Sequence, residues 1–162
     1  MLAAMTPPPR RNAAEQARLD AELIKLAEQH IRFNQVLGLK MITARPPTLR
    51  FEMRPELVGH HLYGRLHGGV ISATLDAMGG VALMWAISEK HAEESTMQVM
   101  HRYSRLGTID LRVDYLRPGL GKHFTASAEV VRLGGRVGST QMRLVNDEDT
   151  LIATAAAAYV VS

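Results

Sequence analysis

The segment from residue 68 to residue 89 constrains the fold of this chain more than any other part. Laid on a helix, it is apolar nearly all round, which indicates burial on most of its sides. The most apolar stretch of this region, residues 66–87, is also long enough to span a membrane. It contains His67, Asp76 and four glycines, however, which a lipid-facing helix would not be expected to carry. The sequence therefore predicts a long core helix and no membrane span.

The residues after this helix change to the period of two that is typical of β-strands. Ile109, Leu111 and Val113 alternate with charged residues, and turn sequences separate four segments of this kind. The predicted strands cover residues 108–116, 122–133, 136–145 and 151–161. The last one is rich in alanine, which also suits a helix, but the preceding turns and its β-branched end favour a strand.

The residues before the long helix add a helix and a hairpin. Residues 13–34 have apolar side chains at helical spacing, and the strand candidates 36–44 and 48–53 flank Pro46 and Pro47. Residues 54–65 have the composition of a loop. Together the pattern predicts an α+β protein: an antiparallel sheet of about six strands wrapped around one long central helix, with an extra N-terminal helix. Residues 1–12 are expected to form a disordered arm, 13–34 the N-terminal helix, and 35–162 one domain.

The composition excludes several classes of protein. The chain has 162 residues and no cysteine, so a disulfide scaffold, a thiolate zinc site, an iron–sulfur cluster and a cysteine nucleophile are excluded. The net charge of +3 is small and its bases are scattered, so nucleic acid is not the expected partner, whereas an anionic small ligand is compatible. The N-terminus has prolines where a signal peptide has its apolar region, which favours a cytoplasmic protein.

The candidate chemistry lies in the run from Arg65 to Asp76, Arg-Leu-His-Gly-Gly-Val-Ile-Ser-Ala-Thr-Leu-Asp. Gly68 and Gly69 start the apolar helix, where unpaired N–H groups and the helix dipole favour a phosphate or the oxyanion of an acyl carbonyl. Asp76 lies two turns further on, where a carboxylate is costly unless it is paired or faces a cleft. Taken singly, each feature also has a structural interpretation: a turn, a hydrogen-bonded His67, or an Asp bonded to a neighbouring chain. Together they match the requirements for attack on a carbonyl.

These residues resemble the hotdog-fold acyl-CoA thioesterases. The resemblance rests on His67-Gly68-Gly69, on the Asp nine residues after that His, and on the later Thr-Ile-Asp-Leu-Arg-Val-Asp-Tyr-Leu-Arg-Pro strand. It is nearest to the phenylacetate-degradation-type branch, and Arg65–Gly80 is similar to a bacterial subgroup that acts on medium- and long-chain acyl-CoA. The resemblance covers roughly residues 33–161. It implies a homodimer, or a homotetramer made of two hotdog dimers, with no cofactor and no metal.

The resemblance also implies a role for several residues. Asp76 corresponds to the catalytic carboxylate, as general base or nucleophile, and Gly68 to the N–H that polarises the thioester carbonyl. Gly69 supports the turn and His67 shapes the loop. Thr108 corresponds to a Ser or Thr that orients the water, and it is expected to come from the partner subunit.

One position departs from the family pattern. Members often carry Asn or Gln six residues before the motif His, where this chain has His61. An imidazole can donate one hydrogen bond as an amide can, so His61 is a candidate for positioning Asp76 or the thioester, or as an alternative base, and exposure to solvent is the other interpretation. Adjacent His60 leaves the register open.

The CoA phosphates require cations, and four candidates lie near strand ends and turns: Arg117, Lys122, Arg132 and Arg136. A solvated surface is the other interpretation for each. The acyl chain is expected in a tunnel lined by Leu75, Met78, Leu83 and the N-terminal helix. The leading hypothesis is an enzyme that hydrolyses acyl-CoA to free fatty acid and CoA. The alternative is a non-catalytic acyl-CoA sensor on the same fold, although the N-terminal arm is too short for a helix-turn-helix module.

Overall fold

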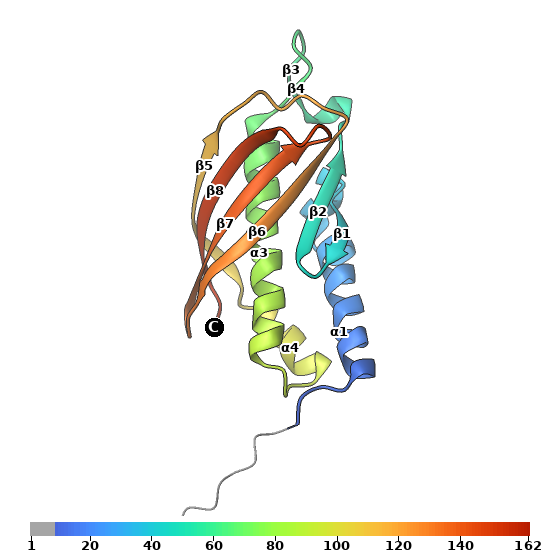
Figure 1. Cartoon of the computed structure of the whole chain (residues 1–162), viewed down its shortest axis with the longest axis vertical. Helices are drawn as coiled ribbons and strands as arrows, with labels where there is room; N and C mark the ends of the chain where they lie inside the picture. Colours follow the sequence, from blue (N-terminus) through green and yellow to red (C-terminus); the bar gives the residue numbers. More distant parts are fainter. Residues whose placement is uncertain (1–8) are drawn as a thin grey trace, which may run out of the picture.

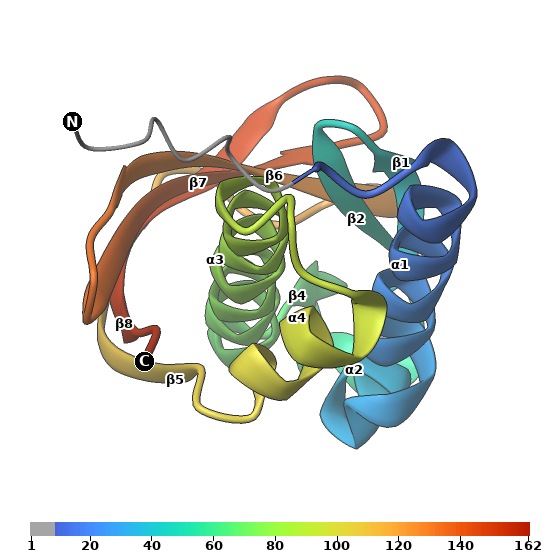
Figure 2. The ribbon, with the colours of Figure 1, turned by 90° about the horizontal axis from the view of Figure 1, so that it is seen from below.

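The apolar segment forms helix α3 (Gly68–Lys90) in the computed structural model, which describes residues 9–162. Six strands form one antiparallel sheet in the order β1-β2-β6-β7-β8-β5 (Figure 1). Their bounds are β1 (Lys40–Ala44), β2 (Pro47–Glu52), β5 (Gly107–Tyr115), β6 (His123–Leu133), β7 (Val137–Asn146) and β8 (Leu151–Val160). The sheet curves around α3, as the end-on view in Figure 2 shows. The predicted α+β fold is confirmed.

The core lies between α3 and the inner face of the sheet. Leu75, Met78 and Leu83 are fully buried there, together with Phe124 and Leu144 from the strands. Gly79 lets the helix approach β7 closely, since a Cβ at this position would lie 2.8 Å from the Thr140 Oγ1. α3 is the one described helix that is long and apolar enough to span a membrane, and 67% of its most apolar window is buried in the fold. This burial agrees with its prediction as a core helix.

The N-terminal helix is divided into three parts. α1 (Ala13–Lys25) continues into a π-helical turn over Leu26–His30, and α2 (Arg32–Leu37) follows. The prediction of one helix over 13–34 is therefore wrong at Ile31, whose extended backbone separates the last two parts. Gly38, with φ at 72°, ends α2 in the left-handed region that suits glycine. As a result, the first strand begins at Lys40 instead of Val36.

The predicted disordered arm falls mostly on residues 1–8, which lie outside the described residues. Arg11, by contrast, is part of the packed structure. Its guanidinium donates to the carbonyls of Ser88, His91 and Glu94, at 2.5, 2.6 and 2.9 Å, and so caps the C-terminal end of α3. The boundary predicted at residue 12 is therefore too late.

Two small features were not predicted. Helix α4 (Thr96–Tyr103) follows α3, and its signal is a capping box in which Ser95 and Gln98 satisfy each other's backbone N–H groups. The segment predicted as a loop holds a 3-10 turn at Pro55–Leu57 and a short hairpin, β3 (Val58–His60) with β4 (Arg65–Leu66). The hairpin projects beyond the sheet at the N-terminal end of α3 (Figure 1).

Candidate active site

His67 starts helix α3 as its N-cap. Its Nδ1 accepts a hydrogen bond from the Gly69 N–H at 2.9 Å, which requires that nitrogen to carry no proton. The N–H groups of Val70 and Ile71 bond to the His67 carbonyl, whereas the Gly68 N–H has no acceptor in the described part of the chain. The hydrogen bond from Gly69 gives the His67 side chain a structural role. The Gly68 N–H, which has no acceptor among the described residues, is available to a ligand.

Asp76 is half-buried on the face of α3 that looks toward β5. The Thr108 hydroxyl donates to its Oδ1 at 2.8 Å, and the Tyr159 hydroxyl donates to its backbone carbonyl at 2.9 Å. Thr108 was expected to come from a partner subunit, and that expectation is wrong. β5 lies alongside α3 in the same chain, so one chain supplies both the carboxylate and its hydroxyl partner.

Burial raises the pKa of the Tyr159 hydroxyl above its usual value, and the negative charge of the nearby Asp76 carboxylate raises it further. Tyr159 therefore stays protonated and remains a donor to the helix backbone beside the carboxylate. The hydroxyl fixes the position of this turn of α3 relative to β8. No local pattern indicates this contact, because Tyr159 lies in the alanine-rich last strand.

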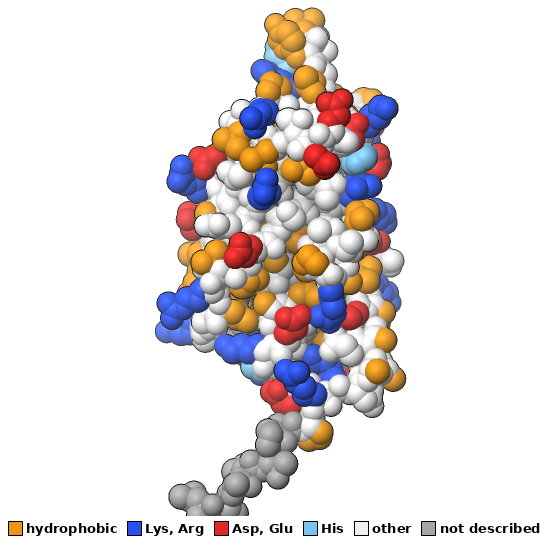
Figure 3. All heavy atoms as spheres, in the orientation of Figure 1, with side chains coloured by type: hydrophobic (Ala, Val, Ile, Leu, Met, Phe, Trp, Pro, Cys, Tyr) orange, Lys and Arg blue, Asp and Glu red, His pale blue; other side chains and the backbone are white. Residues whose placement is uncertain are grey.

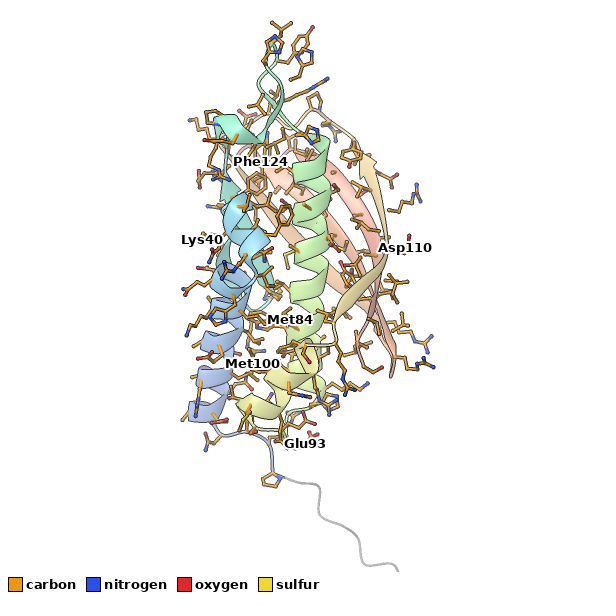
Figure 4. All side chains as sticks on the ribbon, turned by 180° about the vertical axis from the view of Figure 1, so that it is seen from behind. Lys40, Met84, Glu93, Met100, Asp110 and Phe124 are labelled. Atoms are coloured by element: carbon orange, nitrogen blue, oxygen red, sulfur yellow. The ribbon has the colours of Figure 1, made fainter. Side chains whose placement is uncertain are left out.

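A cleft of about 260 Å³ opens at Asp76. Its polar members, Asn34, Asp76, Thr108 and Tyr159, lie among apolar groups from α3, from the N-terminal segment and from the start of β5. The apolar members are Ile31, Phe33, Ala73, Ala77, Gly80, Val81, Met84, Leu106 and Gly107. Met84, labelled in Figure 4, lies on α3.

The prediction that Leu75, Met78 and Leu83 line the acyl tunnel is wrong. Leu75, Met78 and Leu83 have no exposed surface, because they face the sheet on the other side of α3. The contribution of the N-terminal helical segment was predicted, and Ile31 and Phe33 supply it. Phe33, 56% exposed, is one of the large apolar side chains left uncovered in the described chain.

Gly68 and Asp76 lie too far apart along α3 to act on one thioester within a single chain. Eight residues separate them on one helix, which corresponds to about 12 Å along its axis. One carbonyl group needs its oxyanion donor and its base within about 3 Å of the reacting atoms. A single chain therefore cannot apply its own Gly68 and its own Asp76 to the same thioester.

His61 lies on the projecting hairpin, exposed, with its ring 5.4 Å from that of His60. It makes no contact with Asp76 in this chain. His60 also lies 4.9 Å from the Tyr63 ring, so the hairpin tip is a cluster of aromatic rings.

The four predicted cations are not brought together. Arg117 and Lys122 flank the turn whose Gly119 carbonyl accepts from the Leu66 N–H at 2.9 Å, close to the start of α3. Arg132 and Arg136 lie at the other end of the eleven-residue strand β6, more than 30 Å away at about 3.3 Å per residue. One chain therefore cannot hold the phosphates of one CoA with all four.

One group of metal-ligating side chains occurs in the described residues, but it lies far from Asp76. Atoms of His91, Glu93 and Glu94 lie within 4.8 Å of one another, fifteen or more residues further along the chain. Arg102 already binds both carboxylate oxygens of Glu94. This group is therefore not part of the candidate site.

Comparison with known proteins decides the family. The model of the thioesterase superfamily matches residues 63–153, a segment that contains both Asp76 and Thr108. The chain belongs to the thioesterase superfamily. It is 40% identical over 134 residues to the medium/long-chain acyl-CoA thioesterase YigI of Escherichia coli (strain K12), covering 82% of this chain and 86% of that protein.

Two further relatives of this thioesterase agree with that assignment. Human acyl-coenzyme A thioesterase 13 is 26% identical over 77% of this chain and 81% of its own length. A crystal structure of a Shewanella oneidensis protein related to the thioesterase superfamily superimposes with a TM-score of 0.87 at 34% identity, over 94% of this chain and all of that chain. The hotdog resemblance of the sequence is thus confirmed.

Proposed function

We propose that this thioesterase hydrolyses medium- and long-chain acyl-CoA to the free fatty acid and CoA in the cytoplasm. The observation that carries the proposal is the position of Asp76: a carboxylate held by Thr108 in a cleft whose lining is mostly apolar. An acyl chain suits the apolar part, and its thioester carbonyl then lies beside the carboxylate. The likeness to YigI supports the same substrate class.

The chemistry requires a base and an oxyanion donor. In the proposed step, Asp76 takes a proton from a water molecule, and the oxygen of that water bonds to the carbonyl carbon. The negative charge on the carbonyl oxygen is stabilised by the Gly68 N–H at the positive end of α3. The C–S bond then breaks, and the CoA sulfur receives the proton from Asp76. As a nucleophile, Asp76 would instead bond to the carbonyl carbon itself. The C–S bond would break, CoA would leave as the thiolate and take a proton from water, and water would then hydrolyse the resulting anhydride to the fatty acid and the Asp76 carboxylate.

The separation of Gly68 and Asp76 supports a site shared between two copies. β5 is bonded to β8 on one side and is the free edge of the sheet on the other. Ile109 on this strand is 58% exposed. Antiparallel pairing of β5 with the same strand of a second copy would place the two α3 helices side by side. We propose that the Gly68 of one copy then serves the Asp76 of the other.

Further residues receive roles in this proposal. His67 and Gly69 shape the start of α3, through the hydrogen bond between them. Arg117 and Lys122 lie near that start and are proposed to bind the CoA phosphates. His61, carried on the hairpin just before Gly68, is proposed to reach the shared site from the second copy.

A thiol-release assay over short, medium, long and aromatic acyl-CoA tests the function. The proposal expects the highest kcat/KM for medium and long chains. A preference for hydroxybenzoyl-CoA would contradict the substrate class. Tight acyl-CoA binding without thiol release would favour the sensor instead. A single turnover in heavy-oxygen water tests the nucleophilic role, because label in the Asp76 carboxylate arises only when water attacks the aspartyl carbonyl of an anhydride.

A further inference from the structure

Tyr115, the last residue of strand β5, has no role in the mechanism proposed above, although it contacts the start of α3. Its hydroxyl donates a hydrogen bond to the Gly68 carbonyl at 3.2 Å, across 47 positions of sequence. The ring lies beside the same glycine, because a Cβ added to Gly68 would lie 3.4 Å from the Tyr115 Cε1 and 3.7 Å from its Cζ. The end of β5 thus contacts the residue whose N–H is the proposed oxyanion donor.

The peptide group between Gly68 and Gly69 is held from both sides. Its carbonyl oxygen accepts from Tyr115, and its N–H donates to the His67 Nδ1 at 2.9 Å. A peptide group is planar, so these two bonds fix its orientation. The preceding peptide group contains the Gly68 N–H, and its carbonyl, that of His67, accepts from the next turn of the helix. Because both groups that flank the Gly68 Cα are held, the direction of the Gly68 N–H is fixed.

The start of α3 requires such restraints because its first two residues are glycines. Glycine has more backbone freedom than any other residue, and the ends of helices fray. A donor N–H stabilises an oxyanion well only when it already points to the position where the charge develops. Hydrogen bonds that restrict Gly68 and Gly69 therefore contribute to the rate of the reaction.

The surroundings of Tyr115 differ from those of the two other tyrosines that bond to α3. The hydroxyls of Tyr103 and Tyr159 also donate to carbonyls of this helix, but these residues are 6% and 2% exposed and belong to the core. Tyr115 is 55% exposed, and nearby Leu116 and Leu120 are each 49% exposed. The upper end of the molecule in Figure 3, where the hairpin projects, shows apolar side chains at the surface among Lys and Arg side chains. Tyr115 therefore restrains α3 at a surface that a substrate can reach.

The edge-to-edge pairing proposed above brings Tyr115 and Gly68 to the same site of the second copy. Full antiparallel pairing of the nine-residue strand β5 with its own copy is centred on Leu111. In this register Tyr115 lies opposite Gly107 of the second copy. Gly107 belongs to the lining of the cleft that contains Asp76. Tyr115 thus accompanies the donor that it restrains.

We propose that Tyr115 is a positioning residue of the thioesterase reaction. Its hydroxyl acts through the Gly68 carbonyl and keeps the Gly68 N–H directed at the oxygen of the thioester carbonyl. This inference rests on the proposed function and assigns a further residue to it. The restraint matters most when negative charge develops on that oxygen, so its loss lowers kcat and leaves KM nearly unchanged.

Two tyrosine-to-phenylalanine variants test this role. Tyr115→Phe removes the hydroxyl and keeps the ring, and kcat should fall about threefold to tenfold, the effect of one lost neutral hydrogen bond, with KM and melting temperature close to wild type. Tyr103→Phe is the matched control, because it removes a buried hydroxyl that donates to the Met84 carbonyl of the same helix. This control should lower the melting temperature and keep kcat near the wild-type value.

Infrared spectroscopy of bound acyl-CoA with an isotopically labelled carbonyl measures the oxyanion donor without turnover. In the Asp76→Asn variant, the Gly68 N–H should lower the stretching frequency of that carbonyl. Adding Tyr115→Phe should reduce the shift, whereas adding Tyr103→Phe should leave it unchanged. A merely structural role of Tyr115 would not produce this difference.

The results that overturn the inference are distinct from those that overturn the proposed function. Tyr115→Phe with wild-type kcat, with a raised KM alone, or with a melting temperature lowered as much as by Tyr103→Phe overturns it. A loss of roughly a hundredfold or more also overturns it, because the Tyr115 hydroxyl would then be the oxyanion donor itself. If the wild-type chain binds acyl-CoA and releases no thiol, the proposed function fails and the infrared shift decides. A shift that Tyr115→Phe reduces then supports the positioning of Gly68, and an equal shift overturns it.

Discussion

The Thr108 hydroxyl donates a hydrogen bond to Asp76 across the space between β5 and α3, at 2.8 Å, within one chain. The two residues are 32 positions apart in sequence, and the curvature of the sheet around the helix brings them together. The bond fixes the carboxylate in one orientation at the mouth of the cleft and leaves its second oxygen free for water. Substitutions at this site and around it test that arrangement.

Asp76→Asn keeps the size of the side chain and removes its charge. We expect kcat to fall by roughly two to four orders of magnitude, the range for loss of a positioned base. Acyl-CoA binding should persist, because the substitution leaves the Gly68 N–H and the proposed phosphate-binding residues, Arg117 and Lys122, unaltered. A folded, fully assembled variant with near-normal kcat would rule out the mechanism.

Thr108→Val removes the hydroxyl while keeping the branched shape of the side chain. The loss of one hydrogen bond to a charged group, about 1.5–3 kcal/mol, should lower kcat by about tenfold to a hundredfold with little change in KM. Thr108→Ser retains the donor and should recover most of the activity. A Ser variant as impaired as the Val variant would contradict the prediction, because it would show that keeping the hydroxyl donor does not preserve activity.

Gly79 and Gly80 are adjacent but face different surroundings, so they form a matched pair. A Cβ on Gly79 would press on Thr140 and on the Tyr159 hydroxyl, and Gly79→Ala should destabilise the fold by about 1–3 kcal/mol. A Cβ on Gly80 finds its nearest neighbour, a methyl group of Leu106, at 3.8 Å. Gly80→Ala should fold normally and shift the substrate preference toward shorter chains, because Gly80 lines the cleft. Thermal melts and the acyl-CoA panel measure the two effects, and equal melting temperatures for both variants would contradict the prediction.

The carboxylate of Glu94 gives the fold a dependence on acid. Its hydrogen bonds from Arg102 hold the pKa of Glu94 below its usual value of 4.5. A carboxylate with a lowered folded-state pKa stabilises the fold above the unfolded-state value, and this stabilisation is lost as the pH falls through the folded-state value. Glu94→Gln should therefore lower the melting temperature at neutral pH, and the difference from wild type should shrink below about pH 4.5. A difference that stays constant into acid would show that charge is not its cause.

Much of the fold could be predicted from local patterns. The all-round apolar character of residues 68–89 indicates a core helix, and the alternation after Thr108 indicates the strands, because side chains on a strand point to opposite faces. The Gly68-Gly69 start and the out-of-place carboxylate of Asp76 mark the candidate site within one short run of sequence. Each of these patterns is local: it involves only residues of one helix or one strand, so the sequence alone is enough to recognise it.

The tertiary structure alone decided which residues meet. Helical periodicity does not say which side of an all-round apolar helix faces the sheet. The sequence therefore predicts Leu75, Met78 and Leu83 in a tunnel, whereas the structure buries them in the core. Ile31 and Phe33 line the cleft because the N-terminal helix breaks at Ile31 and turns along α3, an arrangement set by packing. The bond between Thr108 and Asp76 likewise depends on how the sheet bends around the helix. The chain's sequence determined the elements and the chemical groups, and long-range packing determined which of those groups share a site, since such contacts depend on residues far apart in the chain.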